Sequence, residues 1–190
     1  MKIPVDIPAV LSAALDIDRA SSIPVSVNIL IDETASPDFQ VFVRAGFNSE
    51  SPNSRVMVSY FPTQTPDTHL GCDLTIIAAA KNESVGALAQ EFRDQGTPVL
   101  VVAENGEEVC TLAEKTGYTL PEHDVVYVQS TEFDDELKGE LAQKIGTWIV
   151  SAVDTDKKLA FSIAYPFVRR PLAIDAISQT ALQNAGIGVV

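Results

Sequence analysis

The sequence predicts a three-layer α/β/α domain, in which helices cover both faces of a mostly parallel sheet of about five strands. Strand-like apolar runs alternate with helical segments along most of the chain, a pattern typical of parallel sheets. Several of these runs are almost continuously aliphatic, as expected of strands that are buried on both faces. A chain of 190 residues with 46% hydrophobic and 21% charged residues is also long enough to bury a proper core.

The first half of the chain supplies two predicted helices and two predicted strands. Asp6 is expected to cap the first helix, and Pro8 lies in its first turn. The sequence Ser-Ser-Ile-Pro after the apolar segment is expected to end this helix. The next helix is expected to turn its phenylalanines and Val43 inward. In chain order we therefore expect a helix over 6–20, a strand over 25–31, a short helix over 37–45 and a strand over 55–61.

The second half continues the alternation with more strongly apolar strands. In one helix, Val85, Leu88, Ala89 and Phe92 recur at helical spacing before Gly96, which marks its end. The last helix begins with acidic residues and places its apolar residues on one face. We expect strands over 73–80, 97–103 and 124–129, and helices over 84–95, 109–117 and 134–153.

The segment after residue 153 has a different composition and suggests a division into two parts. Residues 1–153 are expected to form the α/β domain, and 154–190 a basic linker followed by a truncated helical segment of a second domain. Four of the 13 basic residues lie within 14 positions there: Lys157, Lys158, Arg169 and Arg170. The helix predicted after Pro171 contains too many polar residues for a single membrane span, so it is expected to pack on a partner or lie on a bilayer.

Composition excludes several classes of function. The net charge of -13 and the pI near 4.4 argue against nucleic acid as a partner, because a phosphate backbone requires a positive footprint. Cys72 and Cys110 form no CxxC pair and no histidine cluster accompanies them, so neither a metal nor a cofactor is expected. The two unpaired cysteines fit a reducing environment and the N-terminus is not a secretory signal, so a cytoplasmic protein is expected.

From residue 25 to 153, the order of the elements resembles the small GTPase-like P-loop fold, a Rossmann-like architecture. Where that family has GxxxxGK[ST], this chain reads DETASPDFQVF, and the two acids that open this stretch, Asp32 and Glu33, would repel a polyphosphate. Asp67 to Gly71 has the wrong spacing for DxxG, and Ala103-Glu104-Asn105-Gly106 stands in place of NKxD. The resemblance therefore implies a degenerate GTPase-like domain that lacks its nucleotide-binding motifs.

The tail YPFVRRPLAIDAISQTALQNAGIGVV resembles the start of an uncharacterised bacterial C-terminal domain. That domain sits behind GTPase or GTPase-like domains and continues into hydrophobic helices. The resemblance implies a bacterial protein whose C-terminal helices reach a membrane or a protein partner, with a peripheral position at the inner face of the membrane.

Few residues qualify as site candidates, and each also has a simpler structural interpretation. Asp32 and Glu33 follow the first strand, where open α/β sheets bind ligands, but Asp32 could equally cap the next helix. The basic residues 157, 158, 169 and 170 are candidate contacts to a membrane or a partner, and docking onto the acidic domain itself is an equal alternative. His69 and His123 lack triad spacing, and the acids 134–136 complement a helix dipole.

These observations predict a non-catalytic regulatory or scaffold module. It would be tied to a membrane or a partner through residues 157–190, and it would self-associate through the C-terminal helix. The alternative is a binder of a small ligand, a nucleotide or phosphate compound, that uses the unusual loop after the first strand. No residue pattern supports an enzyme.

Overall fold

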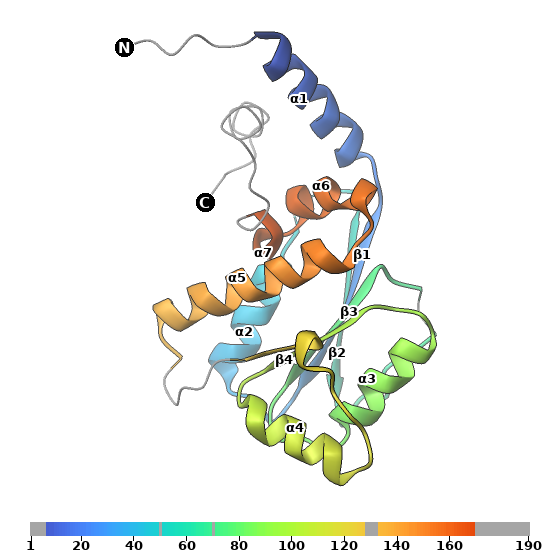
Figure 1. The fold of residues 1–190 in the computed structure, drawn as a ribbon, viewed down its shortest axis with the longest axis vertical. Coiled ribbons are helices and arrows are strands. Elements are labelled where there is room, and N and C mark those ends of the chain that lie inside the picture. The colour runs from blue at the N-terminus through green and yellow to red at the C-terminus, as the bar shows by residue number, and fades with distance from the viewer. Residues whose placement is uncertain (1–6, 50, 70, 128–132, 170–190) are drawn as a thin grey trace.

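The protein folds around one parallel sheet, in a computed structural model that describes residues 7–49, 51–69, 71–127 and 133–169. The strands lie in the order β2-β1-β3-β4-β5, and every neighbouring pair is parallel (Figure 1). Their bounds are Val25–Asp32 for β1, Ser54–Phe61 for β2, Leu74–Ala79 for β3, Val99–Ala103 for β4 and Val125–Tyr127 for β5. The predicted three-layer α/β/α fold is confirmed.

The burial of each strand matches its position in the sheet. Every residue of β3 and β4 is buried, and β1 is buried except for the half-buried Ser26. These are the strands with the most continuous aliphatic runs, because each has a strand on both sides and side chains packed on both faces. The edge strands β2 and β5 are only half-buried over most of their length.

Helices cover the two faces of the sheet unequally. On one face, α2, α5, α6 and α7 pack with the sheet into the larger buried cluster, and on the other face α3 and α4 form the smaller one. A short 3-10 turn, Glu122–Asp124, precedes β5. The helix bounds are Ile7–Ser21 for α1, Pro37–Gly46 for α2, Val85–Asp94 for α3, Gly106–Lys115 for α4, Asp135–Ala152 for α5, Thr155–Ala164 for α6 and Pro166–Arg169 for α7.

Side-chain caps fix where two helices of the larger cluster begin. Ser36 precedes α2 and its Oγ accepts a hydrogen bond from the amide of Phe39 at 3.4 Å, with Pro37 as the first helical residue. Asp134 caps α5 by accepting from the amide of Leu137 at 2.9 Å. Only a few residue types can satisfy the free amides of a first turn. The acidic start of α5 was expected from the sequence, whereas Ser36 was not identified as the cap of α2.

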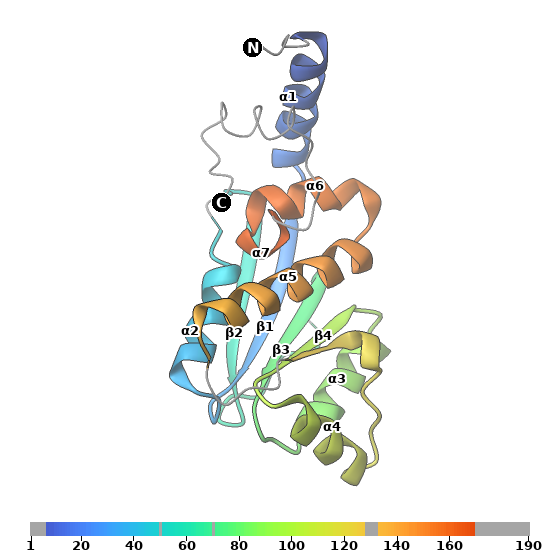
Figure 2. The ribbon, with the colours of Figure 1, turned by 60° about the vertical axis from the view of Figure 1, so that its left-hand side comes forward.

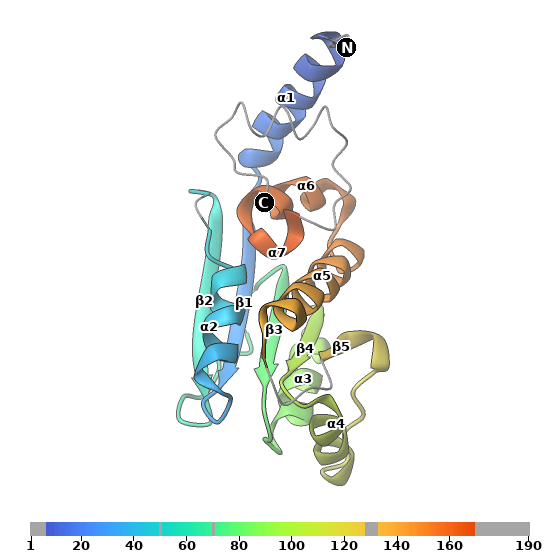
Figure 3. The same ribbon diagram turned by 90° about the vertical axis from the view of Figure 1, so that its left-hand side faces the viewer.

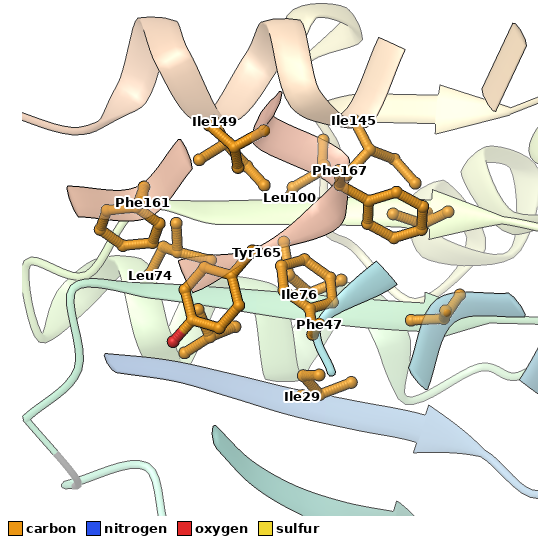
Figure 4. Close-up of a cluster of buried hydrophobic side chains, with 14 of the residues drawn as sticks. Ile29, Phe47, Leu74, Ile76, Leu100, Ile145, Ile149, Phe161, Tyr165 and Phe167 are labelled. Atoms are coloured by element: carbon orange, nitrogen blue, oxygen red, sulfur yellow. The ribbon is translucent and has the colours of Figure 1, made fainter. Parts of the chain in front are cut away.

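The segment that follows residue 153 differs from the expected linker. It forms α6 and α7, and their Phe161, Tyr165 and Phe167 are buried in the same cluster as the sheet. Figure 4 shows these rings between side chains of the sheet and Ile145 and Ile149 of α5. The Tyr165 ring centroid lies 5.7 Å from that of Phe47. The predicted boundary at 154 therefore needs correction: packing joins Thr155–Arg169 to the α/β domain, whereas 170–190 lie outside the described residues.

Helix α1 extends beyond the rest of the molecule, at the end where the strands begin (Figures 2 and 3). It contacts α6, and near its C-terminal end Ile17 and Ala20 are buried. Further out, Leu11 and Leu15 are each 60% exposed. Among the helices that the structure describes, none combines the length and the apolar character needed to span a membrane.

Candidate functional site

The strand order points to the carboxyl edge of the sheet, between β1 and β3, as the candidate site. From β1 the chain crosses to β2 on one side, and from β3 it crosses to β4 on the other, so the connections diverge at this point. Open α/β sheets bind their ligands at such a divergence. The site lies at the opposite end of the sheet from α1 (Figure 3).

Asp32 is fully buried at this position, and both of its carboxylate oxygens are used. Oδ1 accepts from the amide of Thr34 at 2.9 Å and from its hydroxyl at 2.7 Å. Oδ2 accepts from the amide of Ala80 at 3.0 Å, directly after β3. The carboxylate thus joins the end of β1 to the end of β3. The alternative that Asp32 caps the next helix is wrong, because Ser36 caps α2.

The turn from β1 into α2 has no free backbone donor between residues 33 and 36. In α/β nucleotide-binding domains, amides at this place hold a phosphate. Here each amide has an acceptor in the same chain: Glu33 donates to the carbonyl of Phe61 at 3.0 Å, Thr34 to Asp32 Oδ1, Ala35 to the carbonyl of Asp32 at 3.0 Å, and Ser36 to Glu104 Oε2 at 3.0 Å.

Glu104 was not singled out as a site residue from the sequence, but it completes this arrangement. It follows β4, and its carboxylate reaches the N-cap residue of α2, where the helix dipole favours negative charge. A signal was present: Glu104, like Asp32, directly follows a buried strand, and carboxyl ends of parallel strands meet at one edge of a sheet. The length of the side chain and its direction could not be inferred without the fold.

Glu33 does not join Asp32 in a paired acidic site. Its side chain is exposed and accepts a hydrogen bond from the hydroxyl of Thr63, in the loop that follows β2. No group of three or more histidine, cysteine, aspartate or glutamate side chains within the described residues is placed to hold a metal ion. The two candidate acids are thus neighbours in sequence whose side chains do different things.

The basic residues of the C-terminal segment lie away from this edge. Lys157 forms an ion pair with Asp73, just before β3, and thereby fastens α6 to the amino end of the sheet. Arg169 donates to the carbonyls of Ser162 at 3.2 Å and Ile163 at 2.9 Å, at the C-terminal end of α6. Lys158 is half-buried, and Arg170 lies outside the described residues. Lys157 thus contacts a carboxylate of the same chain, and Arg169 contacts backbone carbonyls of α6.

A broad groove of about 890 Å³ runs between the edge strand β5 and helix α5. Its walls include Tyr127 and Trp148, and the indole Nε1 of Trp148 donates to Asp124 at 3.1 Å. The guanidinium of Arg93 binds the other carboxylate oxygen of Asp124, Oδ2, at 3.3 Å. The ring Nε2 of His123 lies 3.6 Å from Oδ1 of Asp124. Because Asp124 already has two strong donors, it is better suited to fixing the start of β5 than to acting as a base.

The two cysteines are free thiols and neither has the surroundings of a nucleophile. Burial raises the pKa of Cys72, with the neighbouring Asp73 adding to the effect against an opposing contribution from Arg55. Burial likewise raises the pKa of Cys110, and Glu114 adds to it. Since the thiolate is the reactive form, these two half-buried thiols are poor nucleophiles near neutral pH.

Comparison with known proteins adds no functional assignment. No family model matches the chain, and no curated protein matches it. One solved structure, described only as the crystal structure of a hypothetical protein, aligns with a TM-score of 0.34 and 14% sequence identity, covering 94% of this chain and 80% of that one.

Proposed function

We propose that this domain is a non-catalytic regulatory or scaffold module that keeps a GTPase-like architecture without using its nucleotide site. One observation supports the proposal: the backbone amides of residues 33–36, where a phosphate would bind, already donate to acceptors of the same chain. Two of those acceptors are the carboxylates of Asp32 and Glu104. The domain thus supplies its own anions to the turn and to the start of α2.

An incoming phosphate would meet a large electrostatic penalty here. It would have to displace Glu104 from the Ser36 amide and then remain near two carboxylates. Like charges about 4 Å apart repel by about 4 kcal/mol at the effective dielectric typical of a protein surface. That penalty corresponds to roughly a thousandfold loss of affinity.

The alternative proposal, a small-ligand site in the same loop, requires that side chains around this loop rearrange. A nucleotide or phosphate compound could bind only if Glu104 swung away and a cation or bound protons neutralised Asp32. Asp32 is fully buried and holds β1 to β3, so binding would disturb the centre of the sheet. The two proposals therefore predict opposite responses to nucleotides.

Thermal unfolding with GTP, GDP and ATP, each with and without magnesium, separates the two proposals. We expect no stabilisation of the natural chain, whereas tight binding at saturating ligand would add several kcal/mol. In Glu104→Ala the Ser36 amide loses its acceptor, and any weak phosphate binding should increase. Glu122→Ala, an exposed acid next to β5, is the matched control. A rise of several degrees for the natural chain would refute the proposal that its nucleotide site is unused and favour the alternative.

We further propose that the sequence after Arg169 provides the link to a membrane or a partner. The sequence places this link in residues 157–190, and we now restrict it to the residues after Arg169. The reason is that Lys157 pairs with Asp73 and Arg169 binds carbonyls at the end of α6. Co-sedimentation with anionic liposomes should be compared for the full chain and a chain that ends at Arg169. We expect only the full chain to pellet, and equal pelleting of both would remove the membrane from the proposal.

A further inference from the structure

The outermost strand β2 has unusual properties for an edge. It is eight residues long and, among the residues that the structure describes, pairs with β1 alone, whereas the described part of the other edge strand, β5, has three residues (Figure 3). Natural sheets protect long edges with prolines, lysines, bulges or inward-pointing charges, because unpaired backbone groups recruit other strands. The strand sequence SRVMVSYF contains no proline and no lysine, and Arg55 is its one charged residue. It contains no acidic residue, although the chain carries 26.

Two hydrogen bonds reveal which residues of β2 face outward. The carbonyl of Asn53 accepts from Val25 at 3.2 Å and that of Phe61 accepts from Glu33 at 3.0 Å, so both point toward β1. In a pleated strand the N–H and C=O of one residue point to the same side, and those of the next residue point to the other. The even-numbered residues 54, 56, 58 and 60 therefore direct their backbone groups away from the sheet.

Both ends of this outer edge are closed by the chain itself, and its middle is open. Ser54 donates to the carbonyl of Ser51 at 3.2 Å. Tyr60 donates to the side-chain oxygen of Gln64 and accepts from the Gln64 amide, both at 2.9 Å. Between these caps, the outward N–H and C=O groups of Val56 and Val58 have no hydrogen-bond partner among the residues that the structure describes.

This open stretch is complementary to itself. If a second copy approaches antiparallel, with a two-fold axis at Met57, then Val56 of each copy lies opposite Val58 of the other. Each such pair exchanges two hydrogen bonds, and together they satisfy all the open groups of Val56 and Val58 in both copies. We propose that β2 pairs with β2 of a second copy of this chain in this register, joining two five-stranded sheets into one.

The side chains around the edge suit the same partner. Val58 is 39% exposed and, with Val56, lines a groove of about 320 Å³ between β2 and the end of α2. The valines of two copies would cover one another on this face, while Met57 meets Met57 on the opposite face. Arg55 lies opposite Ser59 of the second copy, so no like charges face each other. On a chain of net charge -13, a strand without acids is also where two copies repel least.

Molecular mass in solution gives the first test. Light scattering of the full chain at increasing concentration should show a species of twice 20.4 kDa. Val58→Pro removes an outward N–H and leaves the pairing with β1 intact, and Val58→Lys puts a charge in the apolar contact. Both variants should be monomeric with unchanged circular dichroism, whereas Leu15→Lys, which alters an exposed leucine on α1, should remain dimeric.

A cysteine in the strand tests the register directly. Residues at a non-hydrogen-bonded antiparallel pair have Cα atoms about 4.5 Å apart, within reach of a disulfide. With Cys72 and Cys110 replaced by serine, Met57→Cys should therefore form a disulfide-linked dimer on mild oxidation. Ser59→Cys should not, because the two copies of residue 59 would lie roughly 13 Å apart along the strands.

Three results would overturn the proposal. They are a monomeric full chain throughout the high-micromolar range, a dimer that survives Val58→Pro, and cross-linking of Ser59→Cys in preference to Met57→Cys. The second result would place self-association elsewhere, as in the C-terminal segment after residue 169. None of these measurements depends on whether the domain binds nucleotide.

Discussion

Removing α6 and α7 should unfold the domain, although the sequence places them in a linker. A chain that ends at Val153 loses five large buried side chains, namely Phe161, Ile163, Tyr165, Phe167 and Val168, of which Ile163 is the most exposed at 7%. Burial of each stabilises the native state by about 1.5–3 kcal/mol, and of all five by about 7.5–15 kcal/mol. Because domains are stable by only about 5–15 kcal/mol, the shortened chain should have no cooperative thermal transition.

Circular dichroism during heating, together with urea unfolding, measures this effect. A chain that ends at Arg169 keeps both buried clusters and should unfold cooperatively. Phe167→Ala in the full chain should cost about 3–5 kcal/mol, whereas Val41→Ala, at a 64% exposed position on α2, should change the stability by less than about 0.5 kcal/mol. A 1–153 chain as stable as 1–169 would refute the assignment of α6 and α7 to the core.

Three further predictions concern single residues. Asp32→Asn replaces one acceptor oxygen with a donor that faces the amide of either Thr34 or Ala80. This variant should lower the free energy of unfolding, measured by urea denaturation, by about 1–3 kcal/mol. The control Glu33→Gln, at an exposed position, should leave the stability nearly unchanged. Burial raises the pKa of Tyr165 above its ordinary 10.0, with Asp73 and Cys72 contributing. Because the tyrosine then ionises near pH 10 only in the unfolded chain, the free energy of unfolding should fall as the pH rises above about 10. Tyr165→Phe should remove that part of the decline. Gly46→Ala would put a Cβ 1.9 Å from the Phe167 ring and should cost about 1–3 kcal/mol, whereas Gly139→Ala, with no neighbour within 4 Å, should leave the domain equally or more stable by thermal melting.

The sequence predicted the central elements well and the C-terminal ones poorly, for a physical reason. Strands β1, β3 and β4 are continuous aliphatic runs because both of their faces are buried, so their composition alone reveals their environment. Helix α6 begins with a polar stretch that contains Asp156, Lys157 and Lys158 directly after Asp154, and such a stretch suggests a solvated linker. The burial of α6 and α7 brings them into contact with distant parts of the chain, as where Lys157 meets Asp73, 84 positions earlier, and no local pattern can indicate such contacts.

At the candidate site the sequence identifies Asp32 but neither its partners nor the role of Glu104. The sequence places two carboxylates at the ends of buried strands. Because parallel strands end at the same edge of a sheet, both carboxylates are expected at that edge. Only the tertiary structure decided that Asp32 would turn inward to the amides of Thr34 and Ala80, and that Glu104 would reach the start of α2. Chain composition sets which groups are present, whereas hydrogen-bond geometry, which requires contacts accurate to a few tenths of an ångström, exists only once distant segments have packed.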